Sequence, residues 1–284
     1  IAADTGLSKY SVARAVSGKS GVSEATRARV VEAAERLGYK HPVGARTRSI
    51  GAIFEDRERV NGELFAHIQA GMQREAAVLG YAIRAHWMQQ GGELKPFIGE
   101  CDALFAVHLN DDAAFAALLA SGKPVARNGQ APTLGQYDMV HSTDREAGAA
   151  VARHLLDYGH RSLVFVQGAA ELPGRRMRMQ GMSDEVMRCE DATLRVAAWS
   201  DGGDFSGALD DLINDHFEPS AYFCGNDALA LAVVTELLAR GQRIPHDASV
   251  VGFGDFSGAR LIRPALTTVH LPGREIGRAA VRLL

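Results

Sequence analysis

Apolar positions in the first fifty residues recur at helical spacing and are separated by glycines. Ile1–Thr5 is predicted to end one helix, because Gly6 can adopt the left-handed backbone that closes helices. Ser8 is predicted to cap a second helix, and Ser23 a third helix that runs to Leu37. Three short helices with a tight glycine turn are typical of a helix-turn-helix unit, whose second helix enters the DNA major groove. A purely structural three-helix cap is the alternative.

From Ser49 onward, short apolar runs alternate with longer helical patterns, which is typical of parallel sheets. The expected strands are Ile50–Phe54, Ala82–Ala85, Ala103–Val107, Pro124–Ala126, Met139–Val140, Ser162–Val166, Leu194–Ala198, Ala221–Cys224, Ser249–Phe253 and Thr267–His270. The expected helices include Glu63–Leu79, Asp144–Tyr158, Asp204–Asn214 and Asp227–Arg240. The pattern predicts an α/β body of two doubly wound parallel-sheet lobes, with a break near residues 136–143, behind a small all-α head.

Charge is divided unevenly along the 284 residues. The first 49 residues hold nine lysines and arginines against four acidic residues, a net charge of +5, whereas the remainder has a net charge of −8. A basic end on an acidic body favours a head that binds a polyanion, since phosphate neutralisation dominates nucleic-acid affinity. A solvated basic surface is the alternative.

Composition excludes several other classes. Hydrophobic residues make up 46% and charged residues 23%, as in soluble globular proteins, and no apolar run reaches the roughly 20 residues of a membrane span. The start of the chain lacks the basic and apolar regions of a signal peptide. Cys101, Cys189 and Cys224 lie far apart, which argues against disulfides or a clustered metal site and predicts a cytoplasmic protein.

Polar and aromatic residues follow the expected strands of the second lobe. Ligands bind at the carboxyl ends of strands in open α/β sheets, so these residues form a candidate site. They are Arg175, Arg176, Phe205, Asn226, Asp227 and Asp255. A cation, an aromatic face, an amide and carboxylates suit a small polyhydroxylated or heterocyclic ligand. Singly, Asn226 or Asp227 is as well explained as a helix cap.

The head resembles that of the lactose/galactose-repressor family. The motifs that carry the resemblance are Gly6–Gly18 (GLSKYSVARAVSG), Val22–Val30 (VSEATRARV) and Leu37–Tyr39 (LGY). The resemblance implies that Lys9 and Tyr10 contact base edges and that Arg14 is the family arginine of the recognition helix. It makes Ser8 and Ser11 candidate phosphate contacts.

The body resembles the same family. The matching segments are Tyr158–Phe165, Arg176–Gly181, Cys224–Ala230, Ile244–Asp255 and Pro264–Val269. The resemblance implies that Arg176 binds an effector, that Phe205 stacks on it, and that Asn226 and Asp227 bind its hydroxyls. It also implies a dimer interface on the helix Glu63–Leu79. The interface residues would be Phe65, Ile68 and Met72, for which a plain core helix is the alternative.

The sequence departs from the family at several positions. Gly254 and Leu271 stand where sugar-binding members carry an aspartate and a glutamine, and the usual first-lobe carboxylate is missing near Asn128. A standard hexose contact set is therefore not expected. Candidate substitutes are Glu55, Asp56 and His108. In the hinge, Arg46 matches the family but Arg48 replaces its minor-groove leucine, and the connection is short. Helix one begins late, and Ala279–Leu284 stops within a helix.

These observations predict four parts. They are a head at 1–41, a shortened hinge at 42–49, a first lobe at 50–141 plus 271–284, and a second lobe at 142–270. The expected function is a repressor that binds operator DNA as a homodimer or a dimer of dimers and responds to a sugar-like effector. No cofactor and no membrane partner are expected. Solute binding in transport is the alternative function. An enzyme is not expected, since catalytic motifs are absent and His67, His86, His141 and His270 are scattered.

Overall fold

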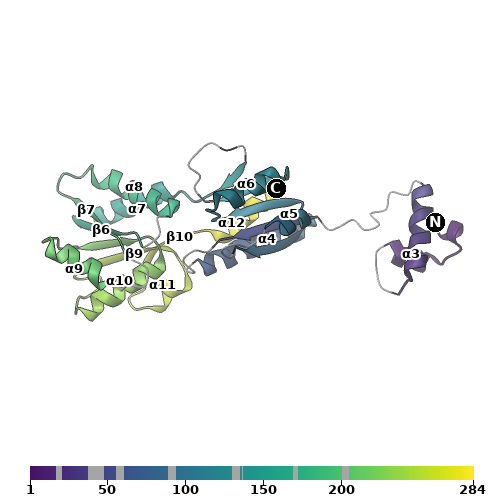
Figure 1. Ribbon diagram of the computed structural model, residues 1–284. Helices are drawn as coiled ribbons and strands as arrows, with labels where there is room; N and C mark the ends of the chain where they lie inside the picture. Colours follow the sequence, from purple (N-terminus) through teal and green to yellow (C-terminus); the bar gives the residue numbers. More distant parts are fainter. Residues whose placement is uncertain are drawn as a thin grey trace. The chain divides into compact units, whose positions relative to one another are not determined.

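The computed structural model describes residues 1–16, 21–37, 48–55, 61–88, 94–129, 135, 137–168, 172–199 and 205–284 (Figure 1). The chain forms two compact units, Ile1–Arg48 and Ser49–Leu284. Within the described part of the chain, no helix combines the length and the apolar character needed to cross a lipid bilayer.

The first unit is a small helical head. Its helices are α1 (Ala2–Thr5), α2 (Lys9–Val16) and α3 (Glu24–Arg36). Gly6 ends α1 in the left-handed conformation, with φ 67°, and Ser23 caps α3 by accepting a bond from the amide of Thr26 at 3.2 Å. Ala15 and Val30 are fully buried at the centre of the head. The predicted end of the first helix at Gly6 and the predicted Ser23 cap of the third helix are therefore confirmed.

The second unit contains two five-stranded sheets in which every pairing is parallel. The strands of the first sheet, in spatial order, are β2 (Ala82–Trp87), β1 (Ser49–Phe54), β3 (Ala103–Val107), β4 (Val125–Asn128) and β5 (Asp138–Val140). Those of the second sheet are β7 (Thr193–Ala197), β6 (Ser162–Val166), β8 (Ala221–Cys224), β9 (Ser249–Gly254) and β10 (Thr267–His270). Both sheets have the same order, second strand first and then first, third, fourth and fifth, as in doubly wound folds.

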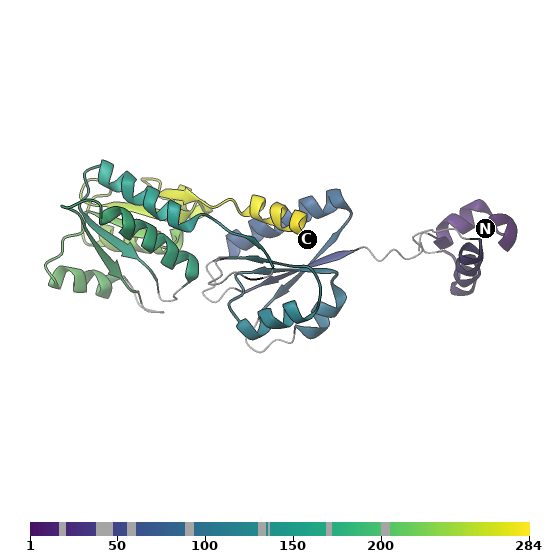
Figure 2. The same ribbon diagram turned by 90° about the horizontal axis from the view of Figure 1, so that it is seen from above.

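Helices connect and cover the strands of each sheet (Figures 1 and 2). Those that follow the strands of the first sheet are α4 (Gly62–Leu79), α5 (Lys95–Glu100) and α6 (Asp112–Ala120). Those of the second sheet are α7 (Asp144–Asp157), α8 (Pro173–Val186), α9 (Ser206–Asn214), α10 (Asp227–Ala239) and α11 (Ser257–Leu261). The last helix, α12 (Gly273–Leu283), returns to the first sheet and packs on α4. The chain thus passes between the lobes twice, after β5 and after β10.

Within each lobe, two helices pack closely against each other at a glycine. A Cβ on Gly277 of α12 would collide with the carbonyl oxygen of Ile68 on α4. In the second lobe, a Cβ on Gly181 of α8 would collide with the carbonyl oxygen of Arg145 on α7. Glycine is therefore required where these helix backbones approach most closely.

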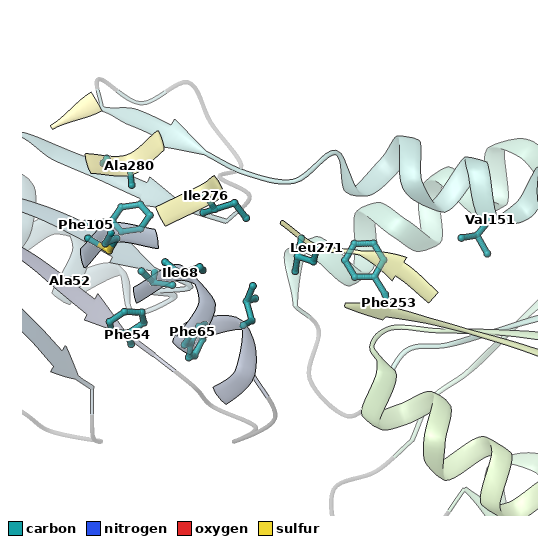
Figure 3. Close-up of a cluster of buried hydrophobic side chains, with 14 of the residues drawn as sticks. Ala52, Phe54, Phe65, Ile68, Phe105, Val151, Phe253, Leu271, Ile276 and Ala280 are labelled. Atoms are coloured by element: carbon teal, nitrogen blue, oxygen red, sulfur yellow. The ribbon is translucent and has the colours of Figure 1, made fainter. Parts of the chain in front are cut away.

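The largest core cluster extends through both lobes (Figure 3). Phe54, Phe65 and Phe105 lie in its first-lobe part, and each is fully buried. Phe253 and Leu271 continue the cluster on the second-lobe side, where the chain leaves β9 and β10. Interior strands such as β3 are buried along their whole length, as their unbroken apolar sequence requires.

Candidate DNA-reading helix and effector cleft

The residues expected to contact DNA gather on the first turns of α2. Ser8 caps the helix, with its hydroxyl accepting a bond from the Ser11 amide at 3.1 Å. Lys9 is exposed, and Tyr10 is 70% exposed. The Arg14 guanidinium donates to the Tyr10 hydroxyl at 3.0 Å. The first turns of α2 thus present an ammonium and a phenol to solvent, with the half-buried guanidinium of Arg14 bonded to the phenol, while Ala15 faces the core.

Two further arginines of the head have structural partners. Arg27 donates to the carbonyl oxygen of Ala15, at the end of α2, at 3.0 Å. Arg29 donates to the carbonyl oxygen of Thr5, at the end of α1, at 3.2 Å. Both cations satisfy carbonyls that a helix end leaves without a partner. Arg48 is exposed at the end of this unit, whereas Arg46 and most of the predicted hinge lie outside the described residues.

A cleft, partly open to solvent, lies between the carboxyl ends of the two sheets. Asn61, His108, Asn110, Arg127 and Asn128 line it from the first lobe. Ser142, Asp144, Arg175, Arg178 and Asn226 line it from the second lobe or from the connection leading into that lobe. Its position is the one expected of a ligand site in doubly wound sheets.

Arg178 is the centre of a buried network on the second-lobe side. Its Nε donates to Oδ1 of Asp144 at 2.7 Å, and one terminal nitrogen donates to the Gly225 carbonyl. The guanidinium lies 3.5 Å from the centre of the Phe253 ring. Burial lowers the pKa of Arg178, and the charge of Arg175 lowers it further, while Asp144 opposes both effects. The group remains a cation held in place by one carboxylate.

Arg175 lies one helical turn before Arg178, so both side chains point from the same face of α8. It is 3% exposed and donates to the Gln167 carbonyl at 3.2 Å. A Cβ on Gly225 would come within 2.9 Å of the Arg175 Cδ, so the glycine leaves space for this side chain. Two guanidiniums are thereby packed at the ends of β6 and β8.

The first lobe contributes a buried arginine and a buried amide from the end of β4. Arg127 donates to the Leu109 carbonyl at 2.8 Å and lies 4.5 Å from the Phe115 ring centre. Asn128 Nδ2 donates to the Val140 carbonyl at 2.9 Å, which fixes the orientation of the amide. Its Oδ1 is buried without a hydrogen-bond partner among the described residues.

The three residues suggested as substitutes for the missing first-lobe carboxylate lie in different places. His108 lines the cleft and has φ 52°. Glu55 accepts a hydrogen bond from the backbone amide of Asn110 at 2.5 Å. Asp56 lies outside the described residues.

Of the six candidate residues predicted from the ends of the second-lobe strands, Arg175 and Asn226 line the cleft. Asn226 has a second role. Its Oδ1 also caps α10 by accepting a bond from the Leu229 amide at 2.9 Å, so the cap interpretation and the cleft position coexist. Arg176 requires a correction, because it is exposed and does not line the cleft. Arg175 and Arg178, on the same helix, line the cleft instead.

The structure also corrects the positions expected for three other residues. Phe205 is 1% exposed and packs against Trp199 and Tyr222 in the core of the second lobe, so its ring has no free face for a ligand. Asp227 and Asp255 do not line the cleft either.

The two carboxylates bind groups of their own lobe. Asp227 accepts from the Thr268 hydroxyl at 2.5 Å and from the Phe256 amide at 2.7 Å, and burial raises its pKa. Asp255 pairs with Arg260 at 2.6 Å and contacts His270 at 3.1 Å, and both contacts lower its pKa. The bonds of Asp227 connect α10 to β10 and to the residue before α11, and those of Asp255 connect the end of β9 to α11 and β10.

The predicted dimer residues also require a correction. Phe65, Ile68 and Met72 are fully buried within this chain, in the main core cluster (Figure 3). A side chain that is buried in its own subunit has no surface to offer a partner, so the core-helix alternative describes these three positions.

A direct polar contact joins the lobes beside the cleft. Glu63, at the start of α4, accepts bonds from the backbone amide and the hydroxyl of Ser257 on α11, at 2.9 and 2.8 Å. Because this contact connects opposite sides of the cleft, any change in the angle between the lobes changes it.

Comparison with known proteins places this geometry in a family. Residues 1–42 match the family of bacterial regulatory proteins called the lacI family, and residues 152–284 match a periplasmic binding protein-like domain. The HTH-type transcriptional repressor CytR of Escherichia coli K12 is 30% identical over 300 residues, covering 98% of this chain and 85% of that protein. The chain belongs to the lacI family.

Other relatives agree with this placement. The HTH-type transcriptional repressor PurR of Aliivibrio fischeri is 27% identical over 305 residues, covering 98% of this chain and 87% of that protein. A structure of the transcriptional regulator CelR with cellobiose matches with a TM-score of 0.73 at 23% identity, over 100% of this chain and 90% of its own. A lac repressor dimer bound to operator has the same TM-score, with 99% and 89% covered. These structures share the fold, and this lacI-family chain is a transcriptional regulator that binds DNA.

The sequence did not identify Arg127, Asp144 or Arg178 as site residues. A signal was present for Arg178, since it lies three positions after Arg175 and therefore shares the same helical face. An arginine inside the otherwise apolar segment before Asn128 was a second signal.

Proposed function

We propose that this regulator is a cytoplasmic repressor that binds a pseudo-palindromic operator as a homodimer and responds to a small effector in the cleft. The exposed Lys9 and Tyr10 and the half-buried Arg14 on α2 support the DNA-binding part of the proposal. Arginine and lysine contact guanine edges and phosphates, and a phenol can bind either.

The need for two heads follows from the size of the interface. One three-helix head offers few base contacts, so two heads must act together, with half-sites about 34 Å or a multiple of this apart. The dimer surface must then use exposed positions of the body, since Phe65, Ile68 and Met72 are in the core.

The cleft supplies the regulatory part of the proposal. Its polar lining comes from both lobes, and its amides suit a sugar or a sugar-like metabolite. An effector that bridges the lobes would change their angle, and with it the spacing of the two heads. Operator affinity would then change by the coupling free energy between the two sites. The proposal includes no catalysis. It also excludes solute transport, because a solute-binding protein does not need a DNA-binding head.

The experiment that tests the DNA-binding part is selection of duplexes from a random library by the full chain, followed by a binding titration. Replacing Arg14 with alanine should weaken binding of the selected duplex by about tenfold or more, the value of one charged contact. Arg188→Ala is the matched control, because Arg188 is an exposed arginine of the body. Equal affinity of the Arg14→Ala variant and the unaltered chain would refute the assignment.

A further inference from the structure

The side chain of Asn128, at the end of β4, contributes one unsatisfied polar atom to the cleft. Asn128 is 4% exposed and lines the cleft, and its Oδ1 has no hydrogen-bond partner among the described residues. Buried polar atoms are hydrogen-bonded in native proteins, because an unpaired one keeps the cost of leaving water without a bond in return. The oxygen therefore needs a donor from a molecule in the cleft.

The surrounding sheet fixes the orientation of this amide. The Nδ2 of Asn128 donates to the carbonyl oxygen of Val140 at 2.9 Å, and the two residues are paired between β4 and β5. The main-chain carbonyl of Asn128 accepts from the amide of His108 at 3.2 Å, which also holds the backbone. Turning the side-chain amide over would place Oδ1 against the Val140 carbonyl, and two acceptors cannot bond to each other. The Nδ2 thus stays on the sheet, and the oxygen is left for a ligand.

The bonding properties of the cleft narrow the group that this oxygen binds. The guanidiniums of Arg127 and Arg178 line the same cleft, and a guanidinium can only donate, whereas the oxygen of Asn128 can only accept. A carboxylate of the ligand could not donate to Asn128, and an N–H group could not accept from an arginine. A hydroxyl does both, so a ligand with several hydroxyls can satisfy donors and acceptors of one cleft.

We propose that Asn128 determines the specificity of the cleft, and that its Oδ1 accepts a hydrogen bond from one hydroxyl of a polyhydroxylated effector. This inference rests on the proposed function, since it assigns a residue and a ligand group within the same cleft. Asparagine serves better than aspartate at this position, because an aspartate would present its second oxygen to the Val140 carbonyl.

The test begins by choosing a sugar that binds. The probes are ribose, xylose, glucose and galactose, which present hydroxyls in different configurations. A ligand that binds only the folded state raises the melting temperature, so at least one of the four is expected to raise that of the full chain. The affinities of this parent sugar and of each of its monodeoxy analogues are then measured by calorimetry.

Variants identify the hydroxyl that Asn128 binds. Asn128→Leu and Asn128→Ala both remove the oxygen, so the assignment does not depend on the folding of one variant. For one hydroxyl position, the deoxy analogue should bind the unaltered chain about tenfold or more weakly than the parent sugar does, and this preference should disappear in both variants. At the other positions the preference should be the same in all three proteins, because those hydroxyls bind elsewhere.

Two further variants separate this role from a structural one. Asn128→Asp keeps an acceptor oxygen and should keep the preference for the parent sugar, although the repulsion from Val140 lowers its melting temperature. Asn214→Leu makes the corresponding change at an exposed asparagine of α9 and should leave every preference unchanged.

Three results would overturn the inference. They are the absence of stabilisation by all four sugars, a preference that no removal of the Asn128 oxygen changes, and loss of the preference in a folded Asn128→Asp variant. Binding of the selected duplex is measured on the same preparations. The role of Asn128 can therefore fail while the DNA-binding function stands.

Discussion

Replacing Asp144 with asparagine should lower the stability of the second lobe by about 3 kcal/mol, because it leaves the buried Arg178 charge without its carboxylate. The side chains of this pair are 12% and 5% exposed, and the Arg178 Nε lies 2.7 Å from the Asp144 carboxylate. Breaking a buried ion pair costs about 3–5 kcal/mol, and the lower value applies here because asparagine can still accept one hydrogen bond.

The same two helices provide a matched control. Arg145 of α7 pairs with Asp184 of α8 at 2.6 Å, but these side chains are 54% and 36% exposed. Water screens an exposed pair, so Asp184→Asn should cost under about 1 kcal/mol. Both substitutions remove one charge from the α7–α8 contact, and burial is the main difference between them.

Urea titration measures the difference. Trp199 packs on Phe205 in the second lobe, and it reports the unfolding of that lobe by fluorescence when both variants also carry Trp87→Phe, which removes the other tryptophan. For a slope of about 3 kcal/mol per molar urea, Asp144→Asn should move the midpoint down by about 1 M, several times the shift of the control. Equal shifts for the two variants would refute the assignment of a buried, uncompensated charge to Arg178.

Two further predictions concern packing and pH. Burial lowers the pKa of His160 below 6.5, so the unfolded chain binds more protons as pH falls from 7.5 to 5.5, and stability should fall over that range. In urea titrations at pH 7.5 and 5.5, His160→Asn should reduce this loss of unfolding free energy. An unchanged loss would contradict its assignment to His160. Gly277→Ala should destabilise by about 1–3 kcal/mol, because the added methyl forces α12 away from α4. Gly99→Ala is the control, because a methyl group added at Gly99 contacts no neighbouring atom. Equal melting temperatures of the two variants would contradict the packing argument.

Much of the fold could be predicted from local pattern. Strands β3 and β6 have the predicted bounds, since an unbroken apolar run between polar residues leaves little freedom of register. Shorter or more exposed elements were harder to place. Strand β7, at the edge of its sheet, begins one residue earlier than predicted, because half-exposed positions weaken the hydrophobic signal. The six-residue α5 has no full amphipathic turn pattern to reveal it.

The site was harder to predict than the fold because it depends on side-chain direction. Choosing among Arg175, Arg176 and Arg178 required knowing that α8 begins at Pro173, which sets the face that meets the cleft. Burial of Phe205 depends on contacts with a neighbouring strand that no local window contains. The pairing of Arg178 with Asp144 joins residues 34 positions apart in the sequence.

The coupling between the cleft and the head is tested most directly by operator affinity with and without effector. A selected, labelled duplex is titrated with the full chain by fluorescence anisotropy, alone and with a saturating concentration of a small molecule that raises the melting temperature of the body. We expect the effector to change the dissociation constant of the duplex by about 5- to 150-fold, the usual range of coupling between two sites. An unchanged dissociation constant, with the probe shown to be bound, would contradict it.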